Sequence, residues 1–388
     1  MAAETKDYFR THLPTYLQRL ETIVNMDSGT ADPDDVAAVS AHFSGWMEQL
    51  SGTVEVLRPN SAYGPFLIGR WQGHGQGRVL LVGHLDTVYS RGEAARRPFT
   101  VSGGRATGCG VIDMKSGCLL ALTAIQAMRD LGREFGELVL ALTPDEEVGS
   151  PVSQPLLAQL ALDQDAILVL EPGRSGGGVV VGRKGVADYT IRAFGHASHA
   201  GVAPQEGHSA VLELCHQALA LSALNGQEDG LQFNVGVFSG GSRPNVVPGE
   251  AQMVVDVRAA SDAAVKRAGQ LFSSLRAKTP GVRLEVEGGF AMPPMETTDQ
   301  IRALFALAQR QALAIGEQLT AVSTGGGSDA NHLAVSGKPV LDGLGPVGGG
   351  AHSPEEFMEV DSVVTRGAIL TALLSQIGAH GRAAFATA

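Results

Sequence analysis

Carboxylate and imidazole side chains stand directly after three short apolar runs of this sequence, at residues 78–83, 137–143 and 165–170. The side chains that follow these runs are His84, Asp86, Glu146, Glu147 and Glu171. Hydrolysis of an unactivated amide needs a strong nucleophile at neutral pH and stabilisation of the charge on the carbonyl oxygen. Two divalent ions roughly 3.5–4 Å apart supply both when about five such ligands hold them, one of them bridging. The sequence therefore contains the residue types of a two-metal hydrolase.

The first apolar run ends in a histidine and an aspartate two residues apart. His84 and Asp86 stand at a predicted strand end, so their side chains project to the same side. His84 can bind a metal through one ring nitrogen while Asp86 accepts a hydrogen bond from the other. For this segment alone, a histidine that ends a strand and an aspartate that starts a turn are an equally good explanation.

Asp113 and His352 stand in segments where each also has an ordinary explanation. Asp113 is expected at a helix start, where a helix-capping role is the commoner one, although a carboxylate there can bridge two cations. His352 lies in the glycine-rich segment 348–353, whose backbone can approach a ligand closely, yet a lone loop histidine is more often solvated. We predict that both bind metal because the other candidate ligands also stand at sheet ends.

Glu146 and Glu147 form an adjacent acidic pair after the second apolar run. Neighbouring carboxylates point in different directions, so one can bind a metal while the other handles a proton. A solvated acidic turn is the alternative. It is less favoured because the pair follows the apolar segment 138–142 without a balancing basic residue.

Strand patterns alternate with helix patterns in the first part of the chain. Helix-like apolar spacing covers residues 6–26, 33–50 and about 114–131. The last part returns to this style, with strands at 319–323 and 339–341 and a helix at 360–377. Such alternation favours an α/β layer architecture, in which ligands bind beyond the carboxyl ends of the strands.

A glycine-rich segment at 173–182 is predicted to be a flexible joint before a second unit. The elements expected after it are a strand, a helix, two strands, a helix and a strand, at residues 186–194, 207–224, 231–238, 251–257, 261–278 and 282–286. This order is typical of the ferredoxin-like α+β fold. We therefore predict an α/β catalytic domain from residues 1–182 and 292–388, with a ferredoxin-like domain inserted at 183–291.

Composition limits the partners and the location. Acidic residues outnumber basic ones by 40 to 29, which disfavours a broad surface for nucleic acid or anionic membranes. No apolar run is judged to approach the roughly 18 residues that span a bilayer, and the first residues lack an apolar signal core. Three cysteines without a CxxC pair favour a reducing compartment. We expect a cytoplasmic enzyme without a membrane or nucleic-acid partner.

Several motifs in order resemble one known family. The sequence reads GHLDTVY, DMKSG, TPDEEVGS, LEP, GHASHAG, NVVPGEAQMVVDVR, GGGSDAN and GGGAHS from about residue 80 onward. This pattern resembles the glutamate carboxypeptidase (carboxypeptidase G type) branch of the dizinc aminoacylase/carboxypeptidase superfamily. The resemblance implies two zinc ions per chain, replaceable by cobalt or manganese, and an α/β/α zinc-hydrolase domain with an inserted lid and dimerisation domain.

The resemblance also implies a role for each matching residue. His84 and Glu171 would bind one zinc, Glu147 and His352 the other, and Asp113 would bridge them. Glu146 would be the general base and acid, and Asp86 the hydrogen-bond partner of His84. His199 would reach the site of the partner subunit in a homodimer and donate to the substrate carbonyl oxygen. Asn245 and Arg258 would hold the substrate α-carboxylate, for which an arginine fork is suited.

The substrate is expected to be a small peptide or N-acyl-amino acid with a free carboxylate. Glutamate preference is open, because the loop after Glu171 departs from the family pattern and offers only Arg174, Arg183 and Lys184 as basic candidates. An N-acyl-amino-acid deacylase with the same metals is the alternative. A nucleotide-dependent oxidoreductase is disfavoured because no GxGxxG motif follows the first strands. A catalytically inactive relative is disfavoured because Glu146 and all five ligand positions are intact.

Overall fold

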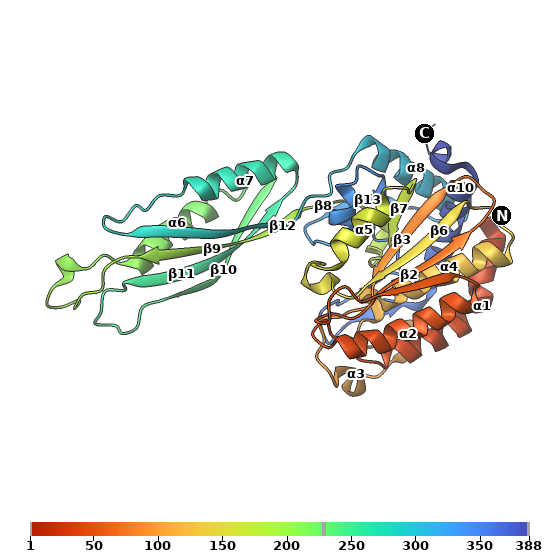
Figure 1. Ribbon diagram of the computed structural model, residues 1–388, viewed down its shortest axis with the longest axis horizontal. Coiled ribbons are helices and arrows are strands. Elements are labelled where there is room, and N and C mark those ends of the chain that lie inside the picture. The colour runs from red at the N-terminus through yellow and green to blue at the C-terminus, as the bar shows by residue number, and fades with distance from the viewer. Residues whose placement is uncertain (1, 227–229, 386–388) are drawn as a thin grey trace. The chain divides into compact units, whose positions relative to one another are not determined.

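The computed structural model describes residues 2–226 and 230–385, which divide into two compact units (Figure 1). The first unit comprises the chain up to Gly182, then Thr297–Ser323 and the chain from Ser328 onward. The second comprises Arg183–Glu296 and Thr324–Gly327. The second unit extends beyond the predicted end at residue 291 because Arg183 and Met295 exchange two backbone hydrogen bonds of 3.0 Å.

The first unit is built on a six-stranded sheet of order β1-β2-β6-β3-β7-β14. Its strands are Thr53–Leu57 (β1), Phe66–Gln72 (β2), Arg78–His84 (β3), Glu137–Thr143 (β6), Ala166–Val169 (β7) and Val340–Leu341 (β14). The strands β6, β3, β7 and β14 are parallel, so their carboxyl ends share one edge. The first two strands, which sequence patterns did not predict, add an antiparallel extension. The predicted α/β class is confirmed.

Three long helices pack together against this sheet. They are Ala2–Val24 (α1), Ser116–Asp130 (α4) and Val360–His380 (α10), and α4 and α10 both contact β3. Helix α2 (Pro33–Gln49) contacts β1 and β2, while α9 (Asp329–Ala334) contacts α5 (Ser153–Ala161), β7 and β14. Nearly every residue of α4 is buried, which explains why it lacks the polar face of a surface helix.

Two helical segments are apolar and long enough to cross a membrane by length and composition, contrary to the sequence-based expectation. They are Val111–Asp130 and Val360–Ala384. Burial inside the unit accounts for their hydropathy, since 89% and 72% of their apolar windows are buried. A helix enclosed by a core needs as much apolar surface as one enclosed by lipid.

The glycine-rich segment at 173–182 is not simply a flexible joint, and that prediction was wrong. Its second half forms strand β8 (Gly178–Arg183), every residue of which is buried. Val180 exchanges two backbone hydrogen bonds with Asp342, at 2.8 and 3.0 Å. The run of β-branched residues Val179, Val180 and Val181 therefore determines the local structure more than the glycines around it.

The second unit has the predicted ferredoxin-like order. Its elements are Gly185–Phe194 (β9), Ala210–Ser222 (α6), Leu231–Gly240 (β10), Glu250–Ala259 (β11), Asp262–Ser274 (α7) and Arg283–Met292 (β12). The sheet order is β10-β11-β9-β12, with antiparallel pairs throughout. Alternate residues of β9 and β11 join both helices in one core, where the rings of Tyr189 and Phe272 stack 3.7 Å apart. Both helices therefore cover the same face of this sheet.

Candidate metal centre

The predicted ligands of the first metal converge at the carboxyl edge of the main sheet. His84 ends β3, and Glu171 follows β7, the strand hydrogen-bonded beside it. Nε2 of His84 lies 3.7 Å from a Glu171 carboxylate oxygen and 3.1 Å from Oδ1 of Asp113. Two donors bound to one tetrahedral zinc lie roughly 3.3 Å apart, given metal–ligand distances of about 2.0–2.1 Å. His84 is therefore spaced to share an ion with either carboxylate. The groups whose donor atoms all lie within 4.8 Å of one another are His84 with Glu146 and Glu171, and His84 with Asp113 and Glu147.

The predicted ligands of the second metal meet the other oxygen of the same aspartate. Nε2 of His352 lies 3.1 Å from Oδ2 of Asp113 and 3.1 Å from a carboxylate oxygen of Glu147. Asp113 thus presents one oxygen to each histidine, which is the geometry of a bridging ligand. The five sequence-predicted ligands thus form one connected cluster, in which His84 links Glu171 to Asp113 and His352 links Glu147 to Asp113.

Asp113 does not cap a helix, although it was expected at a helix start. It lies in the irregular turn Val111–Lys115, and α4 begins at Ser116. The backbone of Asp113 and Met114 in this turn is not helical. Its bond to Met114 is a cis peptide.

A backbone carbonyl determines which nitrogen of His84 faces the metals. Nδ1 of His84 lies 2.9 Å from the main-chain oxygen of Asp86 and 3.5 Å from its carboxylate. Both neighbours are acceptors, so Nδ1 carries the proton and Nε2 is left as the ligand atom. The prediction that the Asp86 side chain is the main partner of this nitrogen was therefore incomplete.

The Asp86 carboxylate instead holds the acidic pair in place. It accepts hydrogen bonds from the backbone nitrogens of Glu146 and Glu147, both at 3.2 Å, and one of 2.7 Å from the Thr30 hydroxyl. Asp86 is fully buried. One side chain therefore connects the histidine strand end to the loop that carries the proposed base and a ligand.

Charge in the centre is arranged to bind cations. Hydrogen bonds to Asp113 and Glu147 raise the pKa of His352 to about 10. Burial alone would lower the pKa of His84, but hydrogen bonds to Asp113 and Asp86 raise it well above its usual value. Burial alone would raise the pKa of Asp113, yet the two histidines lower it. The carboxylates thus hold positive charge between them, which is the role a bound metal would take over.

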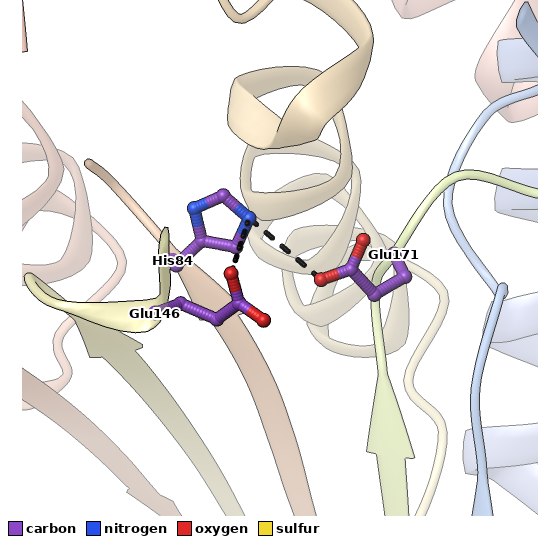
Figure 2. Close-up of side chains that lie close together, drawn as sticks. All are labelled: His84, Glu146 and Glu171. Atoms are coloured by element: carbon purple, nitrogen blue, oxygen red, sulfur yellow. Dashed lines mark ion pairs between the residues drawn. The ribbon is translucent and has the colours of Figure 1, made fainter. Parts of the chain in front are cut away.

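Glu146 differs from the other acidic groups in its electrostatics. Burial raises its pKa well above the usual value, and the negative charges of Glu171 and Asp329 raise it further. Its carboxylate lies 3.9 Å from Nε2 of His84, and Figure 2 shows Glu146 and Glu171 approaching that same nitrogen from different elements. A carboxyl group in this position, beside the candidate ligands and not among the predicted ones, is placed to accept a proton and return it.

Glu356 is a buried carboxylate of the centre that sequence reasoning missed. It accepts hydrogen bonds from the backbone nitrogens of Gly110, Ile112 and Asp113 at 2.9–3.2 Å. The Tyr89 hydroxyl lies 2.7 Å from Glu356 and 3.0 Å from the carbonyl oxygen of Ser353, the residue after His352. Glu356 and Tyr89 therefore tie the Asp113 turn to the His352 loop. The sequence signal that could have indicated Glu356 is the pair of adjacent acidic residues, Glu355 and Glu356, that follows His352 closely.

Asp329, in the GGGSDAN motif, was also given no role from sequence. It accepts hydrogen bonds from the hydroxyls of Thr143, at 3.0 Å, and Ser150, and burial raises its pKa to about 6. These hydroxyls flank the segment that carries Glu146 and Glu147. Asp329 therefore holds both ends of the loop that carries Glu146 and Glu147.

The three predicted residues of the second unit lie at opposite ends of its sheet. His199 and Asn245 are exposed, in loops that follow the end of the sheet where Phe194 pairs with Glu250. The two loops are joined there by a 3.0 Å hydrogen bond from the backbone N–H of Ala200 to the carbonyl oxygen of Asn245. Arg258 pairs with Val186 at the other end. Eight residues of strand separate these ends, or roughly 26 Å. Arg258 also forms a two-pronged ion pair with Asp256, at 2.9 and 2.7 Å.

The basic candidates for glutamate recognition have different environments. Arg183 is buried and donates hydrogen bonds of 2.9 and 3.0 Å to the carbonyls of Gly326 and Gly327. Arg174 is exposed, and Lys184 lies 3.3 Å from the side-chain oxygen of Gln232. Arg183 thus has a structural function in its own unit.

A sequence model of the peptidase family M20/M25/M40 matches residues 80–376, a range that contains all five ligands and Glu146. The chain belongs to this family. It is 31% identical to carboxypeptidase G2 of Pseudomonas sp. (strain RS-16) over 377 residues, covering 94% of this chain and 90% of that protein. This places it in the carboxypeptidase G branch of the M20 metallopeptidases, as the motif resemblance implied.

Other family members differ in their reactions. The chain is 29% identical to the N-acetyl-L-citrulline deacetylase of Xanthomonas campestris over 252 residues, covering 62% of this chain and 65% of that enzyme. Its fold matches a tripeptidase from Staphylococcus aureus with a TM-score of 0.81 at 22% identity, covering 94% and 98% of the two chains. The M20 fold is therefore shown, while the substrate is not decided by family membership.

Proposed function

We propose that this protein is a two-zinc carboxypeptidase that cleaves the amide bond next to a C-terminal amino acid with a free carboxylate. The observation that carries the proposal is Asp113, with one oxygen 3.1 Å from His84 and the other 3.1 Å from His352. Two zinc ions, when bound, would acidify a shared water and polarise the substrate carbonyl. The mixed imidazole and carboxylate donor set suits zinc and also accepts cobalt or manganese.

The remaining work falls to the side chains of the chain itself. Glu146 would take a proton from the attacking water and return it to the leaving amine, since its carboxylate lies 3.9 Å from the metal-facing nitrogen of His84. Asp86 would keep Glu146 and Glu147 in place through their backbone nitrogens. Arg258 would bind the substrate α-carboxylate after leaving Asp256, because a guanidinium fork pairs with either carboxylate.

We further propose that the working enzyme is a homodimer. His199 and Asn245 follow the end of the sheet of the second unit where Phe194 pairs with Glu250, and Arg258 lies eight strand residues, or roughly 26 Å, from that end. One chain therefore cannot direct all three side chains at one small substrate through this unit. If Asn245 and Arg258 hold the same carboxylate, they come from different subunits, and His199 comes with Asn245.

Exposed apolar side chains support such an assembly. The edge strand β10 exposes Val237 and Phe238, and α6, which contacts β10, exposes Leu212 and Leu219. An edge strand with unpaired backbone groups and apolar side chains is suited to pair with a second copy. The three cysteines are free thiols, and we propose a cytoplasmic location on that basis.

Removal of an acyl group from an N-acyl-amino acid is the second candidate. The similarity to a deacetylase supports it, and the metal centre serves both reactions because each cuts an amide beside a free carboxylate.

A substrate panel tests the proposal. The zinc-loaded protein is assayed on dipeptides and N-acyl-amino acids with varied C-terminal residues, and on their methyl esters. We expect cleavage of the free acids, loss of activity on the esters, and loss on zinc chelation that zinc restores. Active protein without any transition metal, or equal cleavage of acids and esters, would contradict the proposal. A preference for N-acetyl substrates over dipeptides would favour the deacylase.

A further inference from the structure

A cavity of about 310 Å³ lies in the first unit beside the second metal position. Its walls are formed by residues 29–32, residues 87–90, Glu147 and Val148. Glu147, whose carboxylate lies 3.1 Å from His352, lines it directly. Glu147 therefore belongs both to the wall of this cavity and to the candidate metal centre.

Two of its walls are held together rigidly behind the metal centre. Thr30 donates its backbone N–H to Thr87, Thr87 donates to Ser28, and the Thr30 hydroxyl donates to Asp86. A β-carbon added at Gly29 would lie 2.4 Å from the carbonyl oxygen of Tyr89. Only glycine therefore allows segments 29–32 and 87–90 to approach this closely. These contacts fix the cavity relative to His84 and its partner Asp86.

The cavity wall is apolar with acidic groups. Val88 and Val148 are 46% and 55% exposed, an unusual state for valines beside a catalytic centre. The charged side chains that line the cavity are Asp32 and Glu147, and neither a lysine nor an arginine lines it. The nearby Arg91 is already paired with Asp32 at 3.3 Å and Asp35 at 2.6 Å.

We propose that this cavity binds the acyl side of the substrate and selects a neutral, apolar acyl group. The amide that is cut joins an acyl group to an amino acid. The amino-acid side always carries the negative charge of the free carboxylate, whereas the acyl side can be neutral. The carboxylate side would find no cation in the cavity wall, since Arg91 is already paired with Asp32 and Asp35, whereas an apolar acyl chain would cover Val88 and Val148. This inference rests on the proposed amide hydrolysis and adds the selectivity for the acyl group.

A charge introduced at Val88 tests this assignment. Wild type is expected to cleave N-hexanoyl-leucine much faster than N-succinyl-leucine, by kcat/KM. Val88→Lys places a cation in the cavity, so the succinyl-to-hexanoyl ratio should rise roughly fivefold or more. Asp32→Asn should raise the ratio in the same direction, because it removes a negative charge and frees Arg91 from one of its partners.

A matched control excludes an effect of surface charge alone. Val56 is 49% exposed, lies on the edge strand β1 and does not line the cavity. Val56→Lys should leave the ratio unchanged. Zinc content and the unfolding midpoint of each variant show whether the centre and fold are intact.

A second substrate series separates the two sides of the amide. With a constant hexanoyl group, Val88→Lys should not change the preference between C-terminal glutamate and leucine. If the variant instead gains activity on C-terminal glutamate, the cavity binds the amino-acid side chain and our assignment is wrong. An unchanged acyl ratio in an active Val88→Lys enzyme also overturns the assignment. A wild type that cleaves none of these amides with zinc bound contradicts the proposed function itself.

Discussion

The neighbouring residues Glu146 and Glu147 are proposed to differ in function, as base and as metal ligand, although they share a chemical type. Glu147 lies 3.1 Å from His352 as a ligand, while Glu146 is buried with a raised pKa. Glu146→Gln should keep both zinc ions and lose kcat by about 10²–10⁴-fold, because it removes the proton carrier but no proposed ligand. Glu147→Gln should also lower the zinc content. Elemental analysis beside steady-state kinetics checks both, and near-normal turnover of Glu146→Gln would exclude it as the base.

Metal affinity should depend on pH through the histidines. In the metal-free protein the pKa of His352 is raised from 6.5 to about 10. Its ion pairs therefore stabilise the metal-free fold fully below pH 6.5 and are lost as the pH rises through about 10. A metal must displace this proton, so zinc affinity should rise by about tenfold per pH unit for each proton released. Competition with a chelator at pH 6.5, 7.5 and 8.5 measures this. An affinity independent of pH would mean that these histidines are already neutral.

Glu356 should act on the metals without binding them. Its carboxylate accepts three backbone hydrogen bonds from the turn that carries Asp113. Glu356→Ala should weaken zinc binding by roughly 10–100-fold, as expected for loss of a group that orients a ligand. Glu356→Gln retains one carbonyl oxygen and should recover part of the affinity. Zinc affinity by chelator competition distinguishes this from a general loss of stability, which would lower the unfolding midpoint and leave zinc binding at 10 °C unchanged.

At the scale of elements, helices reach the metal centre through close backbone approach. A β-carbon added at Gly117 of α4 would lie 2.0 Å from the carbonyl oxygen of Leu170, the residue before Glu171. A β-carbon added at Gly45 of α2 would have no atom within 4 Å. These two helical glycines therefore have opposite roles.

Alanine substitutions measure this difference directly. Gly45→Ala should raise the free energy of unfolding by about 0.5–1 kcal/mol, because alanine is the better helix former. Gly117→Ala should lower it by about 1–3 kcal/mol and reduce zinc content, because the helix and the Leu170 segment must separate. Urea denaturation of both variants tests the pair. Equal effects would show that α4 can move without disturbing Glu171.

At the scale of the whole molecule, activity should depend on two chains. His199→Ala and Glu146→Gln should each be nearly inactive as homodimers, for different reasons. After subunit exchange, one site of each mixed dimer has an intact Glu146 and a partner-supplied His199. With half of the dimers mixed, activity should recover to roughly a quarter of wild type. The doubly defective site adds nothing. No recovery despite verified exchange would mean that His199 acts in its own chain or not at all.

The sequence by itself determined the chemistry of this protein. His84 and Glu171 stand next to apolar runs that form parallel strands. The residues that follow parallel strands lie along one edge of the sheet. Period and composition also predicted the ferredoxin-like unit, because its strands alternate between buried and exposed residues. Local pattern was sufficient wherever a residue's role depends on its own strand or helix.

The tertiary structure decided whatever depends on segments distant in sequence. Glu356 accepts a hydrogen bond from Asp113, 243 residues earlier in the chain, and no periodicity relates the two. Strand β8 was missed because its partners, strand β13 (Thr320–Thr324) and Asp342, also lie far from it in sequence. The separation of Asn245 from Arg258 also required the sheet register, since the twelve intervening residues do not show that the two lie at opposite ends. Long-range hydrogen bonds and register are set by packing, and packing is the physical information that a single sequence does not display.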